Sequence, residues 1–123
     1  MSTPPRHVPL FYRIYDLLVW WHVHTKRFPK SERYTIATRM FELLLEALIG
    51  IMKSEFSQQI EKLNQLERTV TPNINAAKIL VRLAHSLELI SEQKYIQVEC
   101  ELNEIGKMLG AWIRNIQQAK SPH

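Results

Sequence analysis

The sequence predicts an all-α fold, specifically an antiparallel up-down four-helix bundle. Apolar residues recur every three or four positions along four long segments, only three glycines occur among 123 residues, and no strand pattern of alternating apolar and polar residues competes. We expect helices at about residues 9–27, 31–54, 57–90 and 91–117, within a single domain spanning residues 1–123. Flexible tails are expected at residues 1–7 and 119–123.

The first predicted helix begins near Pro9 and carries more apolar surface than one neighbouring helix covers. Its seam residues follow at spacings of three, four and three: Phe11, Ile14, Leu18 and Trp21. Val19, Trp20 and Val23 lie beside that seam and widen the apolar surface. Pro29 ends this region, because the residue before a proline avoids the α conformation.

The second predicted helix, which Ser31 is expected to cap, is apolar around much of its circumference. One stripe contains Ala37, Met40, Leu44, Leu48 and Ile51. Phe41, Leu43, Leu45 and Ile49 extend the apolar surface beyond that stripe. A helix of this kind is either central in the fold or buried in an oligomer.

The third predicted helix contains Pro72, but its apolar register continues through the proline. The register residues are Ile60, Leu63, Leu66, Val70, Ile74, Ala77, Val81, Ala84 and Leu87. We expect one kinked helix because the register is kept. The alternative is a separate helix with Thr71 as its N-cap and Pro72 in its first turn.

The fourth predicted helix has the cleanest amphipathic pattern, with Ser91 as its expected cap. Its seam residues are Tyr95, Val98, Leu102, Ile105, Leu109, Trp112 and Ile116. Gly106 and Gly110 lie one turn apart in this helix, where each glycine costs roughly 1 kcal/mol relative to alanine. We therefore expect another backbone to lie close to these glycines. Together with Trp20, Trp21 and Trp112 they form the predicted packing and oligomer-contact residues.

The sequence has no recognisable enzyme signature, and we predict a non-catalytic protein with no cofactor and no small-molecule substrate. The spacing of His85 and Glu88 reverses the Glu-x-x-His pair of di-iron bundles, and His22 and His24 point to different sides of a helix, so no metal site is expected. The lone Cys100 fits a reducing compartment. Because we find no signal peptide or membrane span, we expect a cytoplasmic protein that does not enter the membrane.

Basic residues supply the candidate binding sites. The formal net charge is +4 and the pI is near 9.4, which permits contact with nucleic acid or an acidic protein. Lys78 and Arg82, four residues apart, share one face of the third predicted helix. Further candidates are Lys26, Arg27, Lys30 and Arg33 near the first interhelical loop, and Lys107 and Arg114 in the last helix. Ordinary solvated surface charge is the alternative for each of them.

Several segments resemble the accessory variability determinant (Avd) family of diversity-generating retroelements. They are Phe28-Pro29-Lys30-Ser31-Glu32-Arg33-Tyr34-Thr35, Leu80-Val81-Arg82-Leu83-Ala84, Leu89-Ile90-Ser91 with Tyr95, and Asn103-Glu104-Ile105-Gly106 with Leu109-Gly110-Ala111-Trp112-Ile113. The resemblance covers about residues 8 to 117, and its last motif is the most specific. Ala111 stands where family members often have glycine, and Pro72 is less usual for the family. The family lies within a wider four-helix group that includes proteins encoded by intervening sequences in bacterial ribosomal RNA genes.

The resemblance implies a barrel-shaped homopentamer that binds a reverse transcriptase and its template RNA, with the cDNA as a further candidate ligand, and so supports mutagenic cDNA synthesis. It also implies that Lys78 and Arg82 match a basic pair on the surface used for partner contact. The alternative is an oligomeric scaffold of the intervening-sequence branch, with no transcriptase partner.

Overall fold

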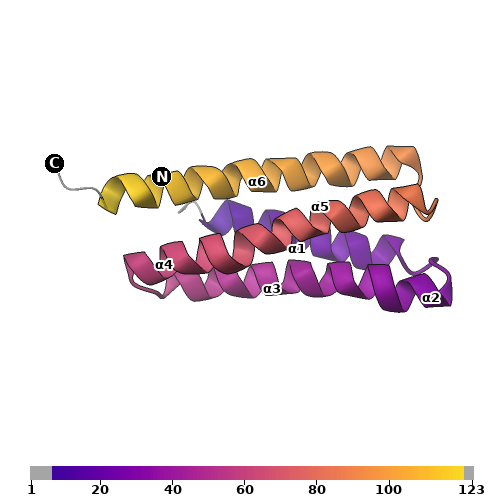
Figure 1. Ribbon diagram of the computed structural model, residues 1–123, viewed down its shortest axis with the longest axis horizontal. Coiled ribbons are helices and arrows are strands. Elements are labelled where there is room, and N and C mark those ends of the chain that lie inside the picture. Colours follow the sequence, from indigo (N-terminus) through magenta and orange to yellow (C-terminus); the bar gives the residue numbers. More distant parts are fainter. Residues whose placement is uncertain (1–6, 121–123) are drawn as a thin grey trace.

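The computed structural model describes residues 7–120 and contains four long helices that pack side by side (Figure 1). The first is α1 (His7–His24) and the last is α6 (Glu92–Lys120). The second comprises α2 (Lys30–Glu32), the π-helical turn η1 (Arg33–Ala37) and α3 (Thr38–Glu55), and the third comprises α4 (Gln59–Gln65), the π-helical turn η2 (Leu66–Val70) and α5 (Thr71–Ser86). Residues 7–120 contain no strand.

The helices form a four-helix bundle in which consecutive long helices are neighbours. α1 packs against α3 and α6, and α5 also packs against α3 and α6. The order around the bundle is therefore α1, α3, α5, α6, and α1 and α5 occupy opposite corners. Each long helix runs opposite to the one before it (Figure 1), as the sequence predicts.

The first interhelical connection begins earlier than expected. α1 ends at His24, after which the hydroxyl of Thr25 donates a hydrogen bond to the Trp21 carbonyl (2.7 Å). The Phe28 ring packs edge-on against the buried Trp21 indole. The next helix begins at Lys30, because the Pro29 carbonyl accepts a hydrogen bond from the Arg33 amide (3.0 Å). The prediction that Ser31 caps this helix is therefore wrong.

The chain ends mostly lie outside the described residues. Residues 1–6 and 121–123, which fall in the expected tails, are not described. His7, Ala119 and Lys120, also expected in the tails, belong to α1 and α6.

Pro72 lies in a continuous helix that contains a π turn just before it. Thr71 has α-helical dihedral angles (φ −60°, ψ −48°), so it continues the helix and does not cap a new one. A proline lacks the amide hydrogen, and its ring meets the carbonyl four residues earlier, here Arg68 within η2. A π turn widens the helix at this point and accommodates that ring.

The turn between α5 and α6 is a Schellman motif with an uncommon residue. The Leu89 amide donates to the Ala84 carbonyl (2.9 Å) and the Glu88 amide donates to the His85 carbonyl (3.0 Å), the two hydrogen bonds that define the motif. Glu88 occupies the left-handed position (φ 61°), where glycine is usual. Ser91 then caps α6 as predicted, accepting a hydrogen bond at Oγ from the Lys94 amide.

The bundle core contains most of the predicted seam residues. Buried side chains on all four long helices include Ile14, Trp21, Met40, Leu44, Val70, Ile74, Val81, Leu102, Ile105 and Trp112. Five predicted seam positions near helix ends depart from this: Ile60 is 54% exposed, Leu87 is 51% exposed, and Phe11, Leu63 and Tyr95 are half-buried. Helix ends have fewer neighbours, so a regular register overestimates burial there.

Gly50 is the glycine that tight packing requires. A Cβ atom at Gly50 would lie 2.7 Å from Cγ2 of the buried Val70, which belongs to η2. α3 and the π turn of the third helix therefore pack more closely at this point than an alanine would allow.

Candidate partner and nucleic-acid interface

A groove between α5 and α6 gathers part of the predicted basic surface. The groove has a volume of about 500 Å³, and Lys78 and Lys107 are among its lining residues. Its apolar part includes Ile74, Leu109 and Ile113. Thr71 also lines it, and the buried hydroxyl of Thr71 has no hydrogen-bond partner among residues 7–120.

Gly106 and Gly110 line this groove and do not pack against a backbone of the same protomer. A Cβ atom at Gly106 would meet Nζ of Lys78 at 3.4 Å, and one at Gly110 would meet Nη1 of Arg114 at 3.4 Å. Both neighbours are ends of flexible side chains. The predicted close backbone is therefore absent from residues 7–120 of one protomer, and the two glycines instead keep the groove open beneath these cations.

Arg82 lies one turn beyond Lys78 on α5 and is exposed. It does not line the groove, but both residues belong to the solvent side of α5. Three exposed apolar residues follow four apart: Ile79 and Leu83 lie on α5, and Leu87 is the C-cap residue just after its end. We call these three residues the α5 apolar stripe.

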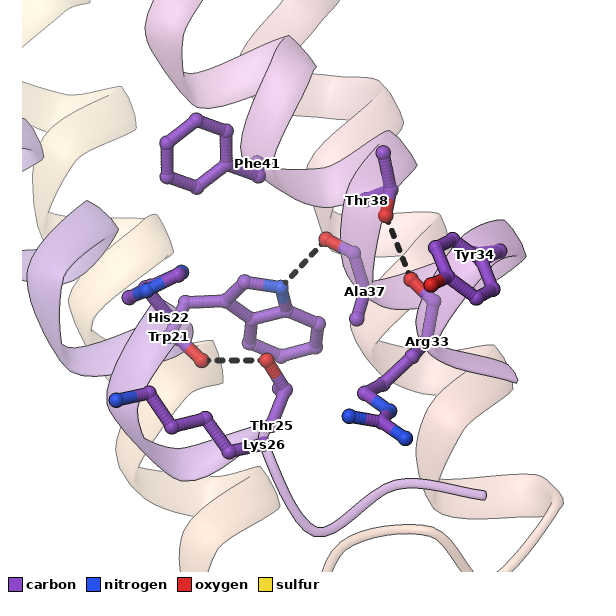
Figure 2. A pocket seen from close by; sticks show the side chains of 9 residues that line it. All are labelled: Trp21, His22, Thr25, Lys26, Arg33, Tyr34, Ala37, Thr38 and Phe41. Atoms are coloured by element: carbon purple, nitrogen blue, oxygen red, sulfur yellow. Dashed lines mark hydrogen bonds between the residues drawn. The ribbon is translucent and has the colours of Figure 1, made fainter. Parts of the chain in front are cut away.

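A second basic site lies where α1 approaches η1 and the start of α3. Figure 2 shows the nine side chains that line this pocket, which has a volume of about 380 Å³. Lys26 comes from the connection just after α1, Arg33 and Tyr34 come from η1, and Phe41 comes from α3. No acidic side chain lines the pocket. Its charge is therefore positive and its wall is partly aromatic.

The floor of this pocket is fixed by hydrogen bonds to backbone carbonyls (Figure 2). The buried Trp21 indole donates from Nε1 to the Ala37 carbonyl (3.0 Å). The Thr38 hydroxyl donates to the Arg33 carbonyl five residues earlier (2.6 Å), across the π turn. Three lining residues, Arg33, Tyr34 and Ala37, belong to the π turn η1. Because π turns occur frequently at functional sites, this supports the pocket as a candidate site.

The remaining predicted cations are exposed but line neither the groove nor the pocket. Arg27 and Lys30 flank the pocket in sequence, and Arg114 lies on α6. Ion pairs among residues 7–120 join Arg13 to Glu101 and Glu104, and Arg39 to Glu42. None of the eight predicted basic residues takes part in those pairs, so their charges are available to an anionic partner.

The predicted tryptophans occupy two different environments. Trp21 and Trp112 are buried in the bundle. Trp20 is half-buried, stacks on His24 (ring centroids 4.0 Å apart) and lines a separate cavity between α1 and α6.

Apolar side chains remain exposed where α1 meets α3. Phe11 and Met52 line one shallow cavity at one end of this contact, and the His22 and Phe41 rings lie 5.8 Å apart at the other. Helical spacing places Tyr15, Leu45 and Ile49 between those ends, and all three are 39–47% exposed. We call Phe11, Tyr15, Leu45, Ile49 and Met52 the α1–α3 apolar face, which ends where the His22 and Phe41 rings meet.

Sequence reasoning identified the two cations of the pocket but missed His22, Thr25, Tyr34 and Thr38 as lining residues. These residues come from two helices joined by a bend, so their meeting depends on tertiary structure. The excess apolar character around Trp21 and Phe41, together with nearby Lys26 and Arg33, is the signal that could have indicated a pocket.

Two classes of site have no support in the described part of the chain. Residues 7–120 hold no group of three or more His, Cys, Asp or Glu side chains placed to bind a metal ion. Within the same range, no helix combines the length and apolar character needed to cross a membrane.

Comparison with known proteins gives a family and a fold. The sequence matches the bAvd-like family over residues 10–116, which is most of the chain. A solved structure from Bacteroides thetaiotaomicron, described as a protein with unknown function from the S23 ribosomal protein family, superposes with a TM-score of 0.79 at 14% identity and covers 89% of this chain and 99% of its own. At that identity the likeness concerns the fold alone. No curated protein matches the chain. The family match extends across all four long helices and includes both basic sites, and the chain belongs to the bAvd-like family.

Proposed function

We propose that this protein is a non-catalytic accessory subunit of a diversity-generating retroelement, acting in the cytoplasm. It would bind the element's reverse transcriptase and template RNA, with the cDNA as a further ligand, and so support mutagenic cDNA synthesis. The family match over residues 10–116 is the observation that carries this proposal. The unpaired cations on α5 and around the first interhelical connection support it, because phosphate groups and acidic protein surfaces bind such residues.

The proposed subunit acts as a ring-shaped homo-oligomer, by the family resemblance a pentamer. The α1–α3 apolar face and the α5 apolar stripe support this assembly because they are exposed on different parts of one protomer. Contact between two different surfaces of neighbouring copies is heterologous, and such contacts close into rings when the rotation permits.

The transcriptase contact is assigned to Lys78 and Arg82. We expect Lys78→Glu combined with Arg82→Glu to abolish copurification with the reverse transcriptase while the oligomer stays intact, because two reversed charges repel an acidic partner surface. Affinity capture of the co-expressed transcriptase measures this. Lys53→Glu with Lys94→Glu is the matched control, since both lysines are exposed, line none of the cavities described above and change the net charge equally. If both double variants captured the transcriptase equally well, Lys78 and Arg82 would not be its contact residues.

A scaffold without a transcriptase partner is the second candidate, because the exposed apolar surfaces call only for an oligomer. The two functions differ in RNA binding. The accessory subunit should bind RNA with an affinity that falls as salt rises, because phosphate contacts release counterions. The scaffold should show no salt-dependent RNA binding.

A further inference from the structure

The pocket between α1 and η1 combines three properties that together specify a ligand. Its rim carries Lys26 and Arg33, and it has no acidic lining residue. Its volume of about 380 Å³ lies in the range of small-molecule sites. Phe41 and the exposed ring of Tyr34, which lie two turns apart on one continuous helix, border the hollow. The pocket therefore suits a planar group attached to an anion.

The hydroxyls in the pocket add a further constraint. Thr25 donates its hydrogen to the Trp21 carbonyl, and Thr38 donates its hydrogen to the Arg33 carbonyl (Figure 2). Each hydroxyl can therefore offer only lone pairs to a ligand. A planar group that hydrogen-bonds to either hydroxyl must supply the donor, as the exocyclic amino groups of adenine, cytosine and guanine do.

We propose that this pocket binds one unpaired base of a single-stranded nucleic acid, with the adjoining phosphates on Lys26 and Arg33. This inference rests on the proposed function for the presence of RNA, and it adds where and in what form RNA is recognised. Exposed Arg27 and Lys30 continue the positive charge past the pocket in the sequence, which favours an extended polyanion over a small free anion. Base stacking on aromatic side chains combined with a cationic path is the usual mode for single strands.

The test compares two single strands of equal length and charge. One is an oligoadenylate of about eight nucleotides, a length within the usual site size, and the other is the corresponding abasic sugar-phosphate chain. We expect the full-length protein to bind the oligoadenylate about tenfold more tightly than the abasic chain at low salt, in line with the stacking contribution of one base. Fluorescence anisotropy of labelled strands measures both affinities.

Two variants separate stacking from charge. Phe41→Leu keeps an apolar side chain on α3 but removes the aromatic face, so the tenfold preference should largely disappear while abasic binding stays unchanged. Lys26→Gln with Arg33→Gln should weaken binding of both strands more than Lys53→Gln with Lys94→Gln, which removes the same charge elsewhere. Circular dichroism confirms that each variant keeps its helical content.

The outcomes distinguish the two proposals. Equal affinity of the unaltered protein for both strands, or an unchanged preference in Phe41→Leu, would overturn the base pocket while leaving RNA binding intact. Binding of neither strand at low salt would overturn both proposals. A glutamate-rich peptide with one tryptophan that displaced oligoadenylate as well as unlabelled oligoadenylate does would assign the pocket to a protein partner and also overturn the inference.

Discussion

At the scale of single residues, Glu88 is the clearest case of local strain. Its backbone has φ 61°, a conformation that costs residues with a Cβ atom roughly 1 kcal/mol more than glycine. The turn keeps this conformation because both Schellman hydrogen bonds form and because the His85 ring stacks on Tyr95 (ring centroids 4.3 Å apart). The fold thus tolerates an unfavourable residue at a position that the surrounding contacts determine.

We expect Glu88→Gly to raise the free energy of unfolding by about 0.5–1 kcal/mol, because the gain at the left-handed position exceeds the loss from a more flexible unfolded chain. Urea denaturation of the variant and the unaltered protein measures the difference. Glu92→Gly, in the first turn of α6, is the control and should lower stability. A stability decrease in Glu88→Gly would show that the carboxylate makes a contact that outweighs the strain.

The glycines differ in how tightly they are packed. The sequence indicated Gly106 and Gly110 as the closely packed ones, but in the structure Gly50 has the nearest neighbour. We expect Gly50→Ala to lower the free energy of unfolding by about 1–3 kcal/mol, because its Cβ would overlap the buried Val70 side chain at 2.7 Å. Gly106→Ala should leave protomer stability unchanged or raise it by up to about 1 kcal/mol, since Lys78 can move away. Thermal unfolding of both variants compares them, and equal destabilisation would contradict the packing described for Gly50.

At the scale of elements, the sequence predicted the four long helices but not the irregular turns within them. The apolar register follows from burial along one side of each helix, so the positions of Leu44, Ile74 and Leu102 in the core were predictable. A π turn adds one residue to a turn, and in η2 Val70 packs against Gly50 of α3. Periodicity alone does not reveal it.

The same distinction applies to the candidate sites. Lys78 and Arg82 were predictable as a pair because four residues make one helical turn. The pocket at η1 was not predictable, because Trp21 and Ala37 meet through a hydrogen bond between helices that the sequence does not display. Its cations were visible in the sequence, but its shape depends on the π turn and on the bend at Pro29.

At the scale of the whole molecule, exposed apolar surface is the property that one protomer leaves unexplained. The α1–α3 apolar face gathers partly exposed apolar side chains from two helices that pack together, and exposed apolar patches mark interaction surfaces. The α5 apolar stripe lies on the helix at the corner opposite α1. Two separate apolar surfaces are what a ring of identical copies requires.

We expect Ile49→Glu to dissociate the oligomer, because it places a charge in the middle of the α1–α3 apolar face at a position that is 39% exposed in the protomer. Multi-angle light scattering should report an oligomer for the unaltered protein and a protomer for this variant. Ile96→Glu, on α6 and outside both apolar surfaces, is the matched control and should remain oligomeric. If the unaltered protein were monomeric at micromolar concentration, the exposed apolar surfaces would not be contacts between copies.

The central claim is that this bAvd-like protein is an accessory subunit of a reverse transcriptase. The most direct measurement is copurification of the tagged, unaltered protein with the reverse transcriptase and template RNA of its own retroelement, co-expressed in one cell. We expect all three to be recovered together, and we expect the variant Lys78→Glu with Arg82→Glu to lose the transcriptase. Recovery of the oligomer with neither transcriptase nor RNA would contradict it.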